Sequence, residues 1–468
     1  MSDLLSIGGN SVKNNQSALT VVSNNIANVH TEGYVRQDLS LQENLPTKSG
    51  LVYLGTGALA SGIKRSYDGL VEASLRTSRS DLSAQQPIIK FTDRIIDVFG
   101  DEKSSLTPAI GSFFDSLRSL SLDASSELLR SQVLGEAKGV ASRLNDLANQ
   151  LIAIDQETRD ITQSKMGTFN VLATELAGVN TKLNRYSDVN KQPPDLLDMR
   201  DELLRQMSGL LKISVEEFPS GQVNVNVGDS SSQAQVVAGS ESVEIGVRFL
   251  EGTPPRNEIL LDPFRNPKNL SGLAGGEIGG LLNFREQLLE PKTNELNDIA
   301  NALMREVNAT HAKGMDMFQQ AGGTFFESPP LFDVNYSLAR GTSQLSVTRD
   351  QASDANVAPL SFLFDEKNNR WIVEDINTGN KFASAAGAKK IAINGLTIAI
   401  EGKPLDGDFI RIQGNKNPAA SIQVRLTDPR QIAAGDLFRV STHIENTGGA
   451  TSTIRLSAGS SEAPAATA

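Results

Sequence analysis

The sequence lacks cysteine altogether and has only three histidines and one tryptophan among its 468 residues. Without cysteine the chain can form no disulfide, no thiolate nucleophile and no cysteine-ligated zinc site. The histidines, His30, His311 and His443, are far apart, and the sequence has neither an H-E-x-x-H nor a G-x-S-x-G motif. We therefore predict that the chain is not an enzyme and has no catalytic, metal or cofactor site.

Long apolar runs and basic patches are lacking as well. No run approaches the roughly 18 residues of a membrane span. The first ten residues, M-S-D-L-L-S-I-G-G-N, lack the basic and continuously apolar regions of a cleavable secretory signal. The net charge is −11, and no basic patch stands out. We therefore expect no membrane insertion and no nucleic-acid partner, while composition alone leaves a cytosolic location open.

What the sequence does contain is a seven-residue repeat of apolar residues at its amino terminus. Aliphatic side chains recur every seven residues, with two more at interleaved positions: Leu5, Val12, Leu19 and Ile26, then Val22 and Val29. This a/d pattern indicates a helix with one narrow stripe for a partner helix. Because a lone helix rich in Ser, Asn, Gln and Thr is marginal in water, we expect it to pack among other copies of itself.

The repeat runs into the string S-N-N-I-A-N-V-H-T-E-G-Y-V-R-Q at residues 23–37. The string resembles the amino-terminal signature of the bacterial flagellar axial proteins, the family of rod, hook and hook-associated proteins, whose pattern is roughly S-x-N-I-A-N-x-x-T-x-G-Y. The matching residues, with the Arg-Gln pair typical of hook-associated members, are Asn25, Ile26, Ala27, Asn28, Thr31, Gly33, Tyr34, Arg36 and Gln37. A capped helix followed by a turn would require only part of this string.

The middle of the chain reads as long helices. Helical spacing covers residues 70–99, with a kink or break expected at Pro87, and residues 106–122, where Phe113, Phe114, Leu117 and Leu120 are expected to face inward. Residues 128–186 predict one helix on the order of 90 Å long. The alternative is two or three bundle helices, broken near Gly167 or Gly178.

Strand-like and acidic segments interrupt these helices. Residues 51–67 predict a short β element ending in R-S-Y-D, and residues 213–227 predict strands around a Ser220-Gly221 turn. The carboxylates of P-P-D-L-L-D-M-R-D-E, at residues 193–202, could indicate a metal or acid/base site. A helix capped by Asp195 explains them better. The glycines of G-G-E-I-G-G, at residues 275–280, open a further helix and lack nucleotide-loop spacing.

These middle segments also resemble hook-associated proteins of the family. The matching blocks are N-D-L-L-D-x-R-D-x-L, G-G-L-L-x-x-R, V-N-x-x-H-x-x-G-x-D and a later Gly-x-x-Phe-Phe, so the resemblance covers about residues 1–330. Beyond it, residues 344–444 alternate like strands, with Trp371 as the expected core anchor. No residue pattern there supports a sugar- or receptor-binding role.

We therefore predict an α+β multidomain fold. Its parts are an axial coiled-coil helix with the signature at 1–35, an elongated long-helix bundle with inserted β segments at 36–340, an outer, mostly antiparallel β domain at 341–447, and a flexible tail at 448–468. The family normally closes with a second heptad helix that pairs with the first. No such helix is found in this sequence, so we expect a fragment, a truncated product or a shorter relative.

The resemblance implies a structural subunit of the flagellum at the hook–filament junction. It implies export through the flagellar type III apparatus, an extracellular location and self-assembly into a ring or tube layer. The implied partners are the hook protein, the second junction protein (hook-associated protein 3), and an export chaperone that binds the carboxyl-terminal region missing here. The alternative is a secreted or surface adhesin-like binding protein that borrowed an axial amino terminus.

Overall fold

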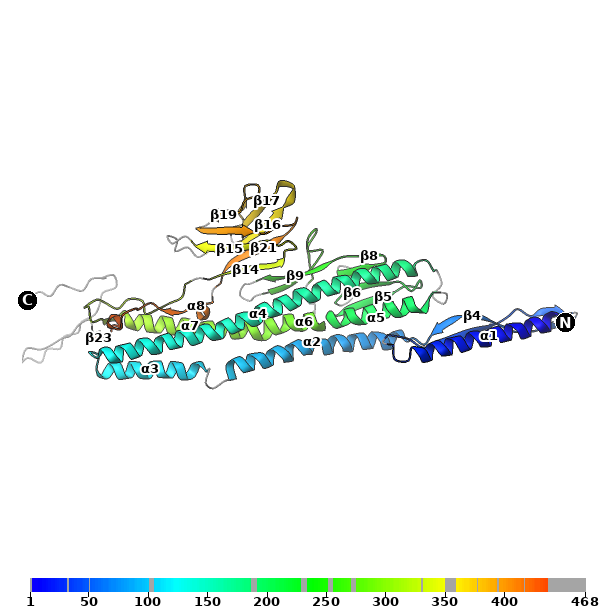
Figure 1. Ribbon diagram of the computed structural model, residues 1–468, viewed down its shortest axis with the longest axis horizontal. Coiled ribbons are helices and arrows are strands. Elements are labelled where there is room, and N and C mark those ends of the chain that lie inside the picture. The colour runs from blue at the N-terminus through cyan, green and yellow to red at the C-terminus, as the bar shows by residue number, and fades with distance from the viewer. Residues whose placement is uncertain are drawn as a thin grey trace, which may run out of the picture.

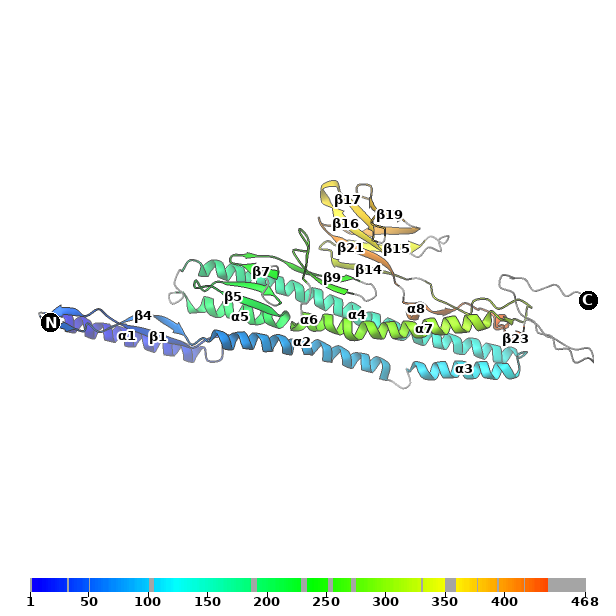
Figure 2. The same cartoon turned by 180° about the vertical axis from the view of Figure 1, so that it is seen from behind.

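The molecule has three parts: a narrow arm, a long helical body and a small β domain standing on one side of the body (Figures 1 and 2). The computed structural model describes residues 2–436, except for residues 32, 50, 101–104, 187–191, 229–233, 251–255, 271–274, 330, 350–358, 377, 394 and 416. The predicted tail at 448–468 lies outside the described residues. None of the described helices is long and apolar enough to cross a membrane.

The arm is one helix backed by one hairpin. Helix α1 (Ser2–Ala27) confirms the predicted amino-terminal helix. The chain then turns back along it as β1 (Gln37–Glu43), followed by the small pair β2 (Thr47–Ser49) and β3 (Val52–Leu54), and returns as β4 (Ala58–Arg65). Strands β1 and β4 pair antiparallel, with a register shift between Ser40 and Leu41. The arm thus consists of two thin layers.

The body is built on α4 (Glu127–Leu183), one uninterrupted helix of 57 residues that is about 85 Å long. The predicted single helix is therefore confirmed. Gly167 and Gly178 do not break it, because the roughly 1 kcal/mol helix cost of each glycine is small beside the apolar surface buried on both sides of it. The other body helices are α2 (Gly69–Gly100), α3 (Leu106–Leu122), α5 (Pro194–Leu210), α6 (Gly276–Phe284) and α7 (Glu290–His311).

Two expectations for these helices are wrong in detail. No break occurs at Pro87: α2 continues through this residue, whose buried ring packs at α6, where a Cβ on Gly280 would lie 2.8 Å from the Pro87 Cγ. In α3, Phe113 and Leu120 are buried as expected, but Phe114 is 51% exposed. The i, i+1 neighbours of a helix point about 100° apart, so both rings cannot face one narrow core.

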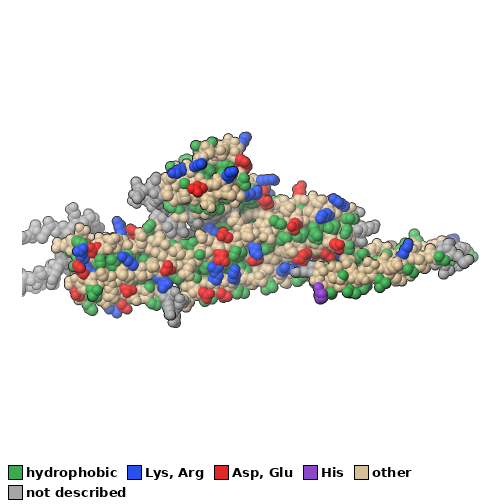
Figure 3. Space-filling view, viewed as in Figure 1, with side chains coloured by type: hydrophobic (Ala, Val, Ile, Leu, Met, Phe, Trp, Pro, Cys, Tyr) green, Lys and Arg blue, Asp and Glu red, His purple; other side chains and the backbone are tan. Residues whose placement is uncertain are grey.

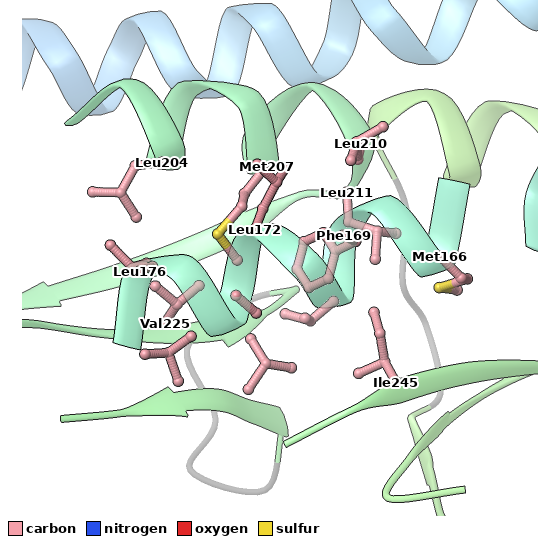
Figure 4. Close-up of a cluster of buried hydrophobic side chains, with 14 of the residues drawn as sticks. Met166, Phe169, Leu172, Leu176, Leu204, Met207, Leu210, Leu211, Val225 and Ile245 are labelled. Carbon is pink, nitrogen blue, oxygen red and sulfur yellow. The ribbon is translucent and has the colours of Figure 1, made fainter. Parts of the chain in front are cut away.

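A β layer covers one end of α4 and α5. It consists of two antiparallel sheets, β5 (Ile213–Glu217), β6 (Val223–Val227), β7 (Gln235–Ala238) and β8 (Glu241–Ser242), and then β9 (Ile245–Leu250), β10 (Arg256–Leu261) and β11 (Lys268–Leu270). The predicted turn between β5 and β6 is confirmed, with Gly221 at φ +74°. Side chains of α4, α5 and these strands interdigitate in one apolar core (Figure 4).

A second core fills the other half of the body. It joins α2, α3, α4 and α7 to the segment that follows the β domain: α8 (Pro418–Ser421), β22 (Gln423–Val424) and β23 (Gly435–Asp436). Strand β22 pairs with β13 (Phe326–Glu327), and β23 pairs with β12 (Gly314–Met315). Between α6 and α7 the helix takes a π turn at Arg285–Leu289, just before Pro291.

The outer β domain is shorter at its carboxyl end than predicted and begins earlier. Two sheets enclose its core: β14-β21-β16-β17-β18 and β15-β20-β19. Their strands are β14 (Leu331–Leu338), β15 (Gln344–Arg349), β16 (Leu360–Asp365), β17 (Arg370–Asp375), β18 (Lys381–Ala383), β19 (Lys390–Ile393), β20 (Leu396–Glu401) and β21 (Phe409–Asn415). Trp371 is 2% exposed in this core, as predicted.

The described strands of that domain do not coincide with the expected span of 341–447, and residue 447 itself lies outside the described residues. The chain enters at Leu331 and leaves after Asn415, because β14 and β21 pair side by side. Ile422, Leu426 and Ile432 form an apolar pattern that resembles another strand, yet they fill the second body core. An alternating pattern identifies buried residues but does not tell which core they enter.

Close helix contact at Gly280 leads to a stability prediction. A Cβ on this residue would lie 2.1 Å from the Ala84 carbonyl oxygen of α2. Gly280→Ala should therefore lower the free energy of unfolding by about 1–3 kcal/mol in urea denaturation. Gly178→Ala is the matched control, because no atom lies within 4 Å of its Cβ position. That variant should gain up to about 1 kcal/mol; equal effects of the two variants would contradict the packing.

Glu290, at the start of α7, makes the stability of the fold depend on pH. Burial raises the pKa of the Glu290 carboxyl to about 7, against the opposing charge of Arg285. The folded chain thus keeps this proton after the unfolded chain has released it, so stability is lost as pH rises from about 4.5 to 7. The free energy of unfolding of Glu290→Gln should rise relative to that of the native chain by about 1 kcal/mol as pH increases from 5.5 to 8, as measured by urea melts. This value is reduced to allow for partial solvation of the carboxyl. A stability difference independent of pH would contradict this.

Candidate functional site: the arm and its root

The signature residues lock the turn that ends α1. The Asn25 side chain accepts hydrogen bonds at Oδ1 from the Gln37 N–H (3.0 Å) and the Tyr34 hydroxyl (2.8 Å), and its Nδ2 donates to the Gln37 carbonyl (2.8 Å). Gln37 lies opposite Arg65 in the β1–β4 pair, and the Asn25 carboxamide satisfies both of its backbone hydrogen-bonding groups. The resulting clamp makes the chain reverse and start β1 beside the helix.

The remaining signature residues divide into two groups. The Asn28 Nδ2 donates a hydrogen bond to the Asn24 carbonyl (3.0 Å), and its Oδ1 accepts one from the Thr31 hydroxyl (3.1 Å). These two bonds close the end of the helix. Gly33 has φ +83°, a left-handed conformation that favours glycine, and sits against Glu202. Ile26, Ala27 and Arg36 are instead exposed. Only the first group makes contacts within the turn.

We call the six predicted packing residues the seam. All are exposed, by 51–82%: Leu5, Val12, Leu19, Val22, Ile26 and Val29. The arm's own hairpin lies on another face of α1, where Ile7 faces Gly57, the Asn14 Nδ2 donates to the Ala58 carbonyl and Val21 is buried. Ile7 follows Leu5 by two residues, about 200° around a helix. The stripe of Leu5, Val12, Leu19 and Ile26 therefore points away from the hairpin, whereas Val22 lies nearer the hairpin side of α1 and Val29 lies beyond the end of the helix.

The hairpin adds exposed apolar residues that sequence reasoning did not identify. They lie on β1, β3, β4 and the loops between them: Leu41, Leu45, Leu51, Tyr53, Leu54 and Leu59. Apolar side chains are accordingly visible at the surface along the arm (Figure 3). A helix with one two-stranded layer has no third layer to enclose these groups. The arm thus exposes more large apolar side chains than the predicted seam alone.

A buried ionic cluster joins the arm to the body. Arg65, at the end of β4, pairs with Asp198 (2.6 Å) and Asp201 (2.7 Å) of α5. Arg200 pairs with the same Asp201 (2.7 Å) and with Glu217 of β5 (2.7 Å). We call these five residues the root cluster. Its Arg65, Arg200 and Asp201 side chains are only 6%, 1% and 0% exposed.

Neighbouring groups complete the root cluster. The Arg200 guanidinium donates to the Gly221 carbonyl (2.7 Å), and the Tyr67 ring lies 5.1 Å from the Arg65 guanidinium and 6.0 Å from that of Arg200. Burial lowers the pKa of Arg200, but the charges of Asp201 and Glu217 outweigh it and the pKa is raised. Burial raises the pKa of Asp198 despite the charge of Arg65. The cluster is therefore both desolvated and charge-paired.

The acidic segment 193–202 is structural, although one expectation for it is wrong. Asp195 does not cap α5: the N-cap position belongs to Pro193, with no side-chain hydrogen bond, and Asp195 lies in the first turn. Asp198 and Asp201 instead belong to the root cluster, and Glu202 pairs with Arg205 (2.8 Å). The sequence signal for the pairing of Asp198 and Asp201 with Arg65 is limited to the excess negative charge of D-M-R-D at residues 198–201.

Side chains that ligate metal ions do not gather in the described part of the chain. No group of three His, Cys, Asp or Glu side chains there could hold a metal ion. His311 lies at the end of α7, as expected, and it also clamps two segments: its Nδ1 is 2.7 Å from the Gly323 carbonyl, and the Ala433 N–H donates to its Nε2 (2.9 Å). The fold and the site thus define an elongated structural protein.

Comparison with known proteins gives the particular family. Residues 92–326, just over half of the chain, match the family of the flagellar hook-associated protein FlgK helical domain. Residues 5–34 match the flagella basal body rod protein family, which covers most of α1 and the signature turn. The chain therefore belongs to the FlgK family of flagellar hook-associated proteins. Its role is structural, at the hook–filament junction of the flagellum.

Individual relatives agree with this assignment. The chain is 26% identical over 442 residues to flagellar hook-associated protein 1 of Salmonella typhimurium strain LT2, covering 92% of this chain and 79% of the relative. It is 23% identical over 343 residues to the Bacillus subtilis strain 168 protein of that name, covering 67% of each. The solved flagellar hook junction protein FlgK of Burkholderia pseudomallei shares the fold, with a TM-score of 0.52 at 21% identity, over 78% of this chain and 66% of that one.

We predict that breaking the root cluster lowers stability much more than breaking an exposed ion pair. Asp201→Asn removes the carboxylate shared by Arg65 and Arg200. Leaving two buried guanidiniums underpaired should cost about 3–5 kcal/mol in urea denaturation, with faster amide exchange in β4. Asp115→Asn, which removes an exposed 3.8 Å pair with Arg118, should change stability by less than about 1 kcal/mol. Two variants of equal stability would show that the cluster does not hold the arm.

Proposed function

We propose that the chain acts mechanically, as a subunit of a closed layer between hook and filament, and that its seam is the surface on which neighbouring subunits pack. The observation that carries this is the seam itself: six aliphatic side chains at heptad spacing, exposed on an arm without an interior. Burying one such side chain is worth roughly 1.5–3 kcal/mol. The six together supply a strong driving force for association.

The partners follow from the relatives and remain part of the proposal. Proteins named for their association with the hook, and for the hook junction, are the chain's relatives. We therefore expect further copies of this chain beside it, the hook protein on one side and hook-associated protein 3 on the other. We also expect secretion through the flagellar type III apparatus, an extracellular location and an export chaperone acting before assembly.

The outer β domain favours no second function by itself. An adhesin-like binding protein with a borrowed arm would also carry an exposed β domain. That alternative requires the arm to be dispensable for filament growth, whereas the junction role requires it. A variant confined to the seam therefore separates the two functions, and deletion of the whole gene provides the reference phenotype.

We predict that the double variant Leu5→Glu with Leu19→Glu folds normally but fails to assemble. Both side chains are exposed in the single chain, at 82% and 67%, so folding loses no contact, while an assembled seam would bury two charges. Circular dichroism and urea melts should match the native chain. In a strain that lacks the gene, the variant should give hooks without filaments in electron micrographs, with flagellin in the medium.

The control is Leu122→Glu, an equally exposed leucine on α3 at 86%. It should restore filaments and swimming like the native chain. Filaments of normal length with the seam variant would overturn the packing role of the seam. Normal filaments in the deletion strain itself would overturn the structural role in that strain, and missing hooks would place the subunit lower on the axis.

A further inference from the structure

The outer β domain has a cleft on the side where its two sheets separate. Strand β18 is the edge of the five-stranded sheet, and β19, the next strand in sequence, is the edge of the three-stranded sheet. The short segment between them passes from one sheet to the other. A cleft of about 470 Å³ opens between the two edges, within the size range of ligand sites.

The floor of this cleft is apolar. Phe382 of β18 pairs with buried Val373, and Ile391 and Ile393 of β19 pair with buried Ile398 and Leu396. Residues directly opposite in neighbouring strands share one face of a sheet, so these side chains point toward the core. Phe382 is nevertheless 45% exposed. Between these two strand edges, neither sheet covers the apolar side chains.

Both rims of the cleft are strand edges. Each of β18 and β19 pairs with only one strand among the described residues, so its outer backbone groups have no strand partner there, and both strands contribute residues to the cleft lining. An added strand between them would join the two sheets into one continuous sheet. Peptides bind sheet edges in this way, with main-chain hydrogen bonds giving affinity and alternate side chains giving specificity.

The unpaired charge beside the cleft is positive and lies on the β19 rim. Lys390 lines the cleft, and Lys389 precedes it; neither makes an ion pair within the described part of the chain. Lys381 on the opposite rim pairs with Glu374 at 3.4 Å. Lysines on edge strands disfavour pairing of one edge with the same edge of another copy. They favour an incoming strand that carries acidic residues.

We infer that this cleft binds an extended segment of another protein, in which apolar and acidic residues alternate. Because successive side chains of a strand point to opposite faces, apolar residues would cover Phe382 and Ile391 while acidic residues face the lysine rim. The interaction is separate from the seam and independent of the junction role. It gives the outer domain a docking surface for peptides that carry acidic residues.

The test uses the full chain and a fluorescein-labelled peptide of alternating valine and glutamate, with binding followed by fluorescence anisotropy. We expect a Kd from about 1 to 100 μM, weakened by salt. A peptide with lysine in place of glutamate should bind at least about tenfold more weakly. A valine–glutamate peptide that is N-methylated on alternate residues should also bind more weakly, because it cannot donate hydrogen bonds to one of the two strand edges.

Matched variants locate the site. Lys389→Glu with Lys390→Glu should weaken binding at least about tenfold, whereas Lys367→Glu, an exposed lysine in the turn between β16 and β17, should leave it unchanged. Equal binding of the acidic and basic peptides, or full binding by the N-methylated peptide, would overturn the inference. Absence of peptide binding up to 1 mM would also overturn the inference. Dimers that form with rising protein concentration, and that the double variant does not form, would overturn it as well, because they would assign the cleft to a second copy of the chain.

Discussion

The arrangement of the whole chain depends on the desolvated root cluster. The arm contacts the body over a small area, and the charges of Arg65, Arg200 and Asp201 meet there with almost no exposure to water. Ion pairs of this kind add little net stability over apolar packing, but removing one partner is costly. Their effect is to restrict geometry, because a guanidinium satisfies its partners in only a few orientations. An arm held in one direction presents its seam in one direction.

The two ends of the molecule meet different physical requirements. The body buries its own apolar side chains: α4 runs through two apolar cores, of which Figure 4 shows the one shared with α5 and the β layer. The arm has the opposite character, with leucines and valines at its surface and only Val21 of α1 buried among the described side chains. A rigid body with an unsatisfied arm is the construction expected of a subunit that completes its packing in an assembly. The outer domain has its own core but contacts the β layer of the body, where Arg340 pairs with Glu244 and the Arg248 guanidinium lies 5.3 Å from the Phe409 ring.

Local sequence patterns predicted the helices and turns well, but they did not predict contacts between residues far apart in the sequence. The helix at Leu106–Leu122 and the turn at Gly221 follow from spacing and turn residues alone. The partners of Arg65 do not, because Asp201 is 136 residues away and no periodicity connects two charges across such a distance. Similarly, the aliphatic residues after Asn415 were assigned to the β domain because sequence alone does not tell which core they fill. The seam was identified by its spacing, yet the orientation of its stripe away from the hairpin required the structure.

The absence of cysteine allows the central claim, that the seam is buried in the assembled flagellum, to be tested directly. Val12→Cys introduces a single thiol on the seam, and Lys367→Cys places one on the outer domain as a reference. Maleimide labelling would be compared between purified monomers and intact detached flagella. The account predicts that Val12→Cys is labelled in monomers and protected in flagella, while Lys367→Cys reacts in both. Equal labelling of Val12→Cys in both states would contradict it.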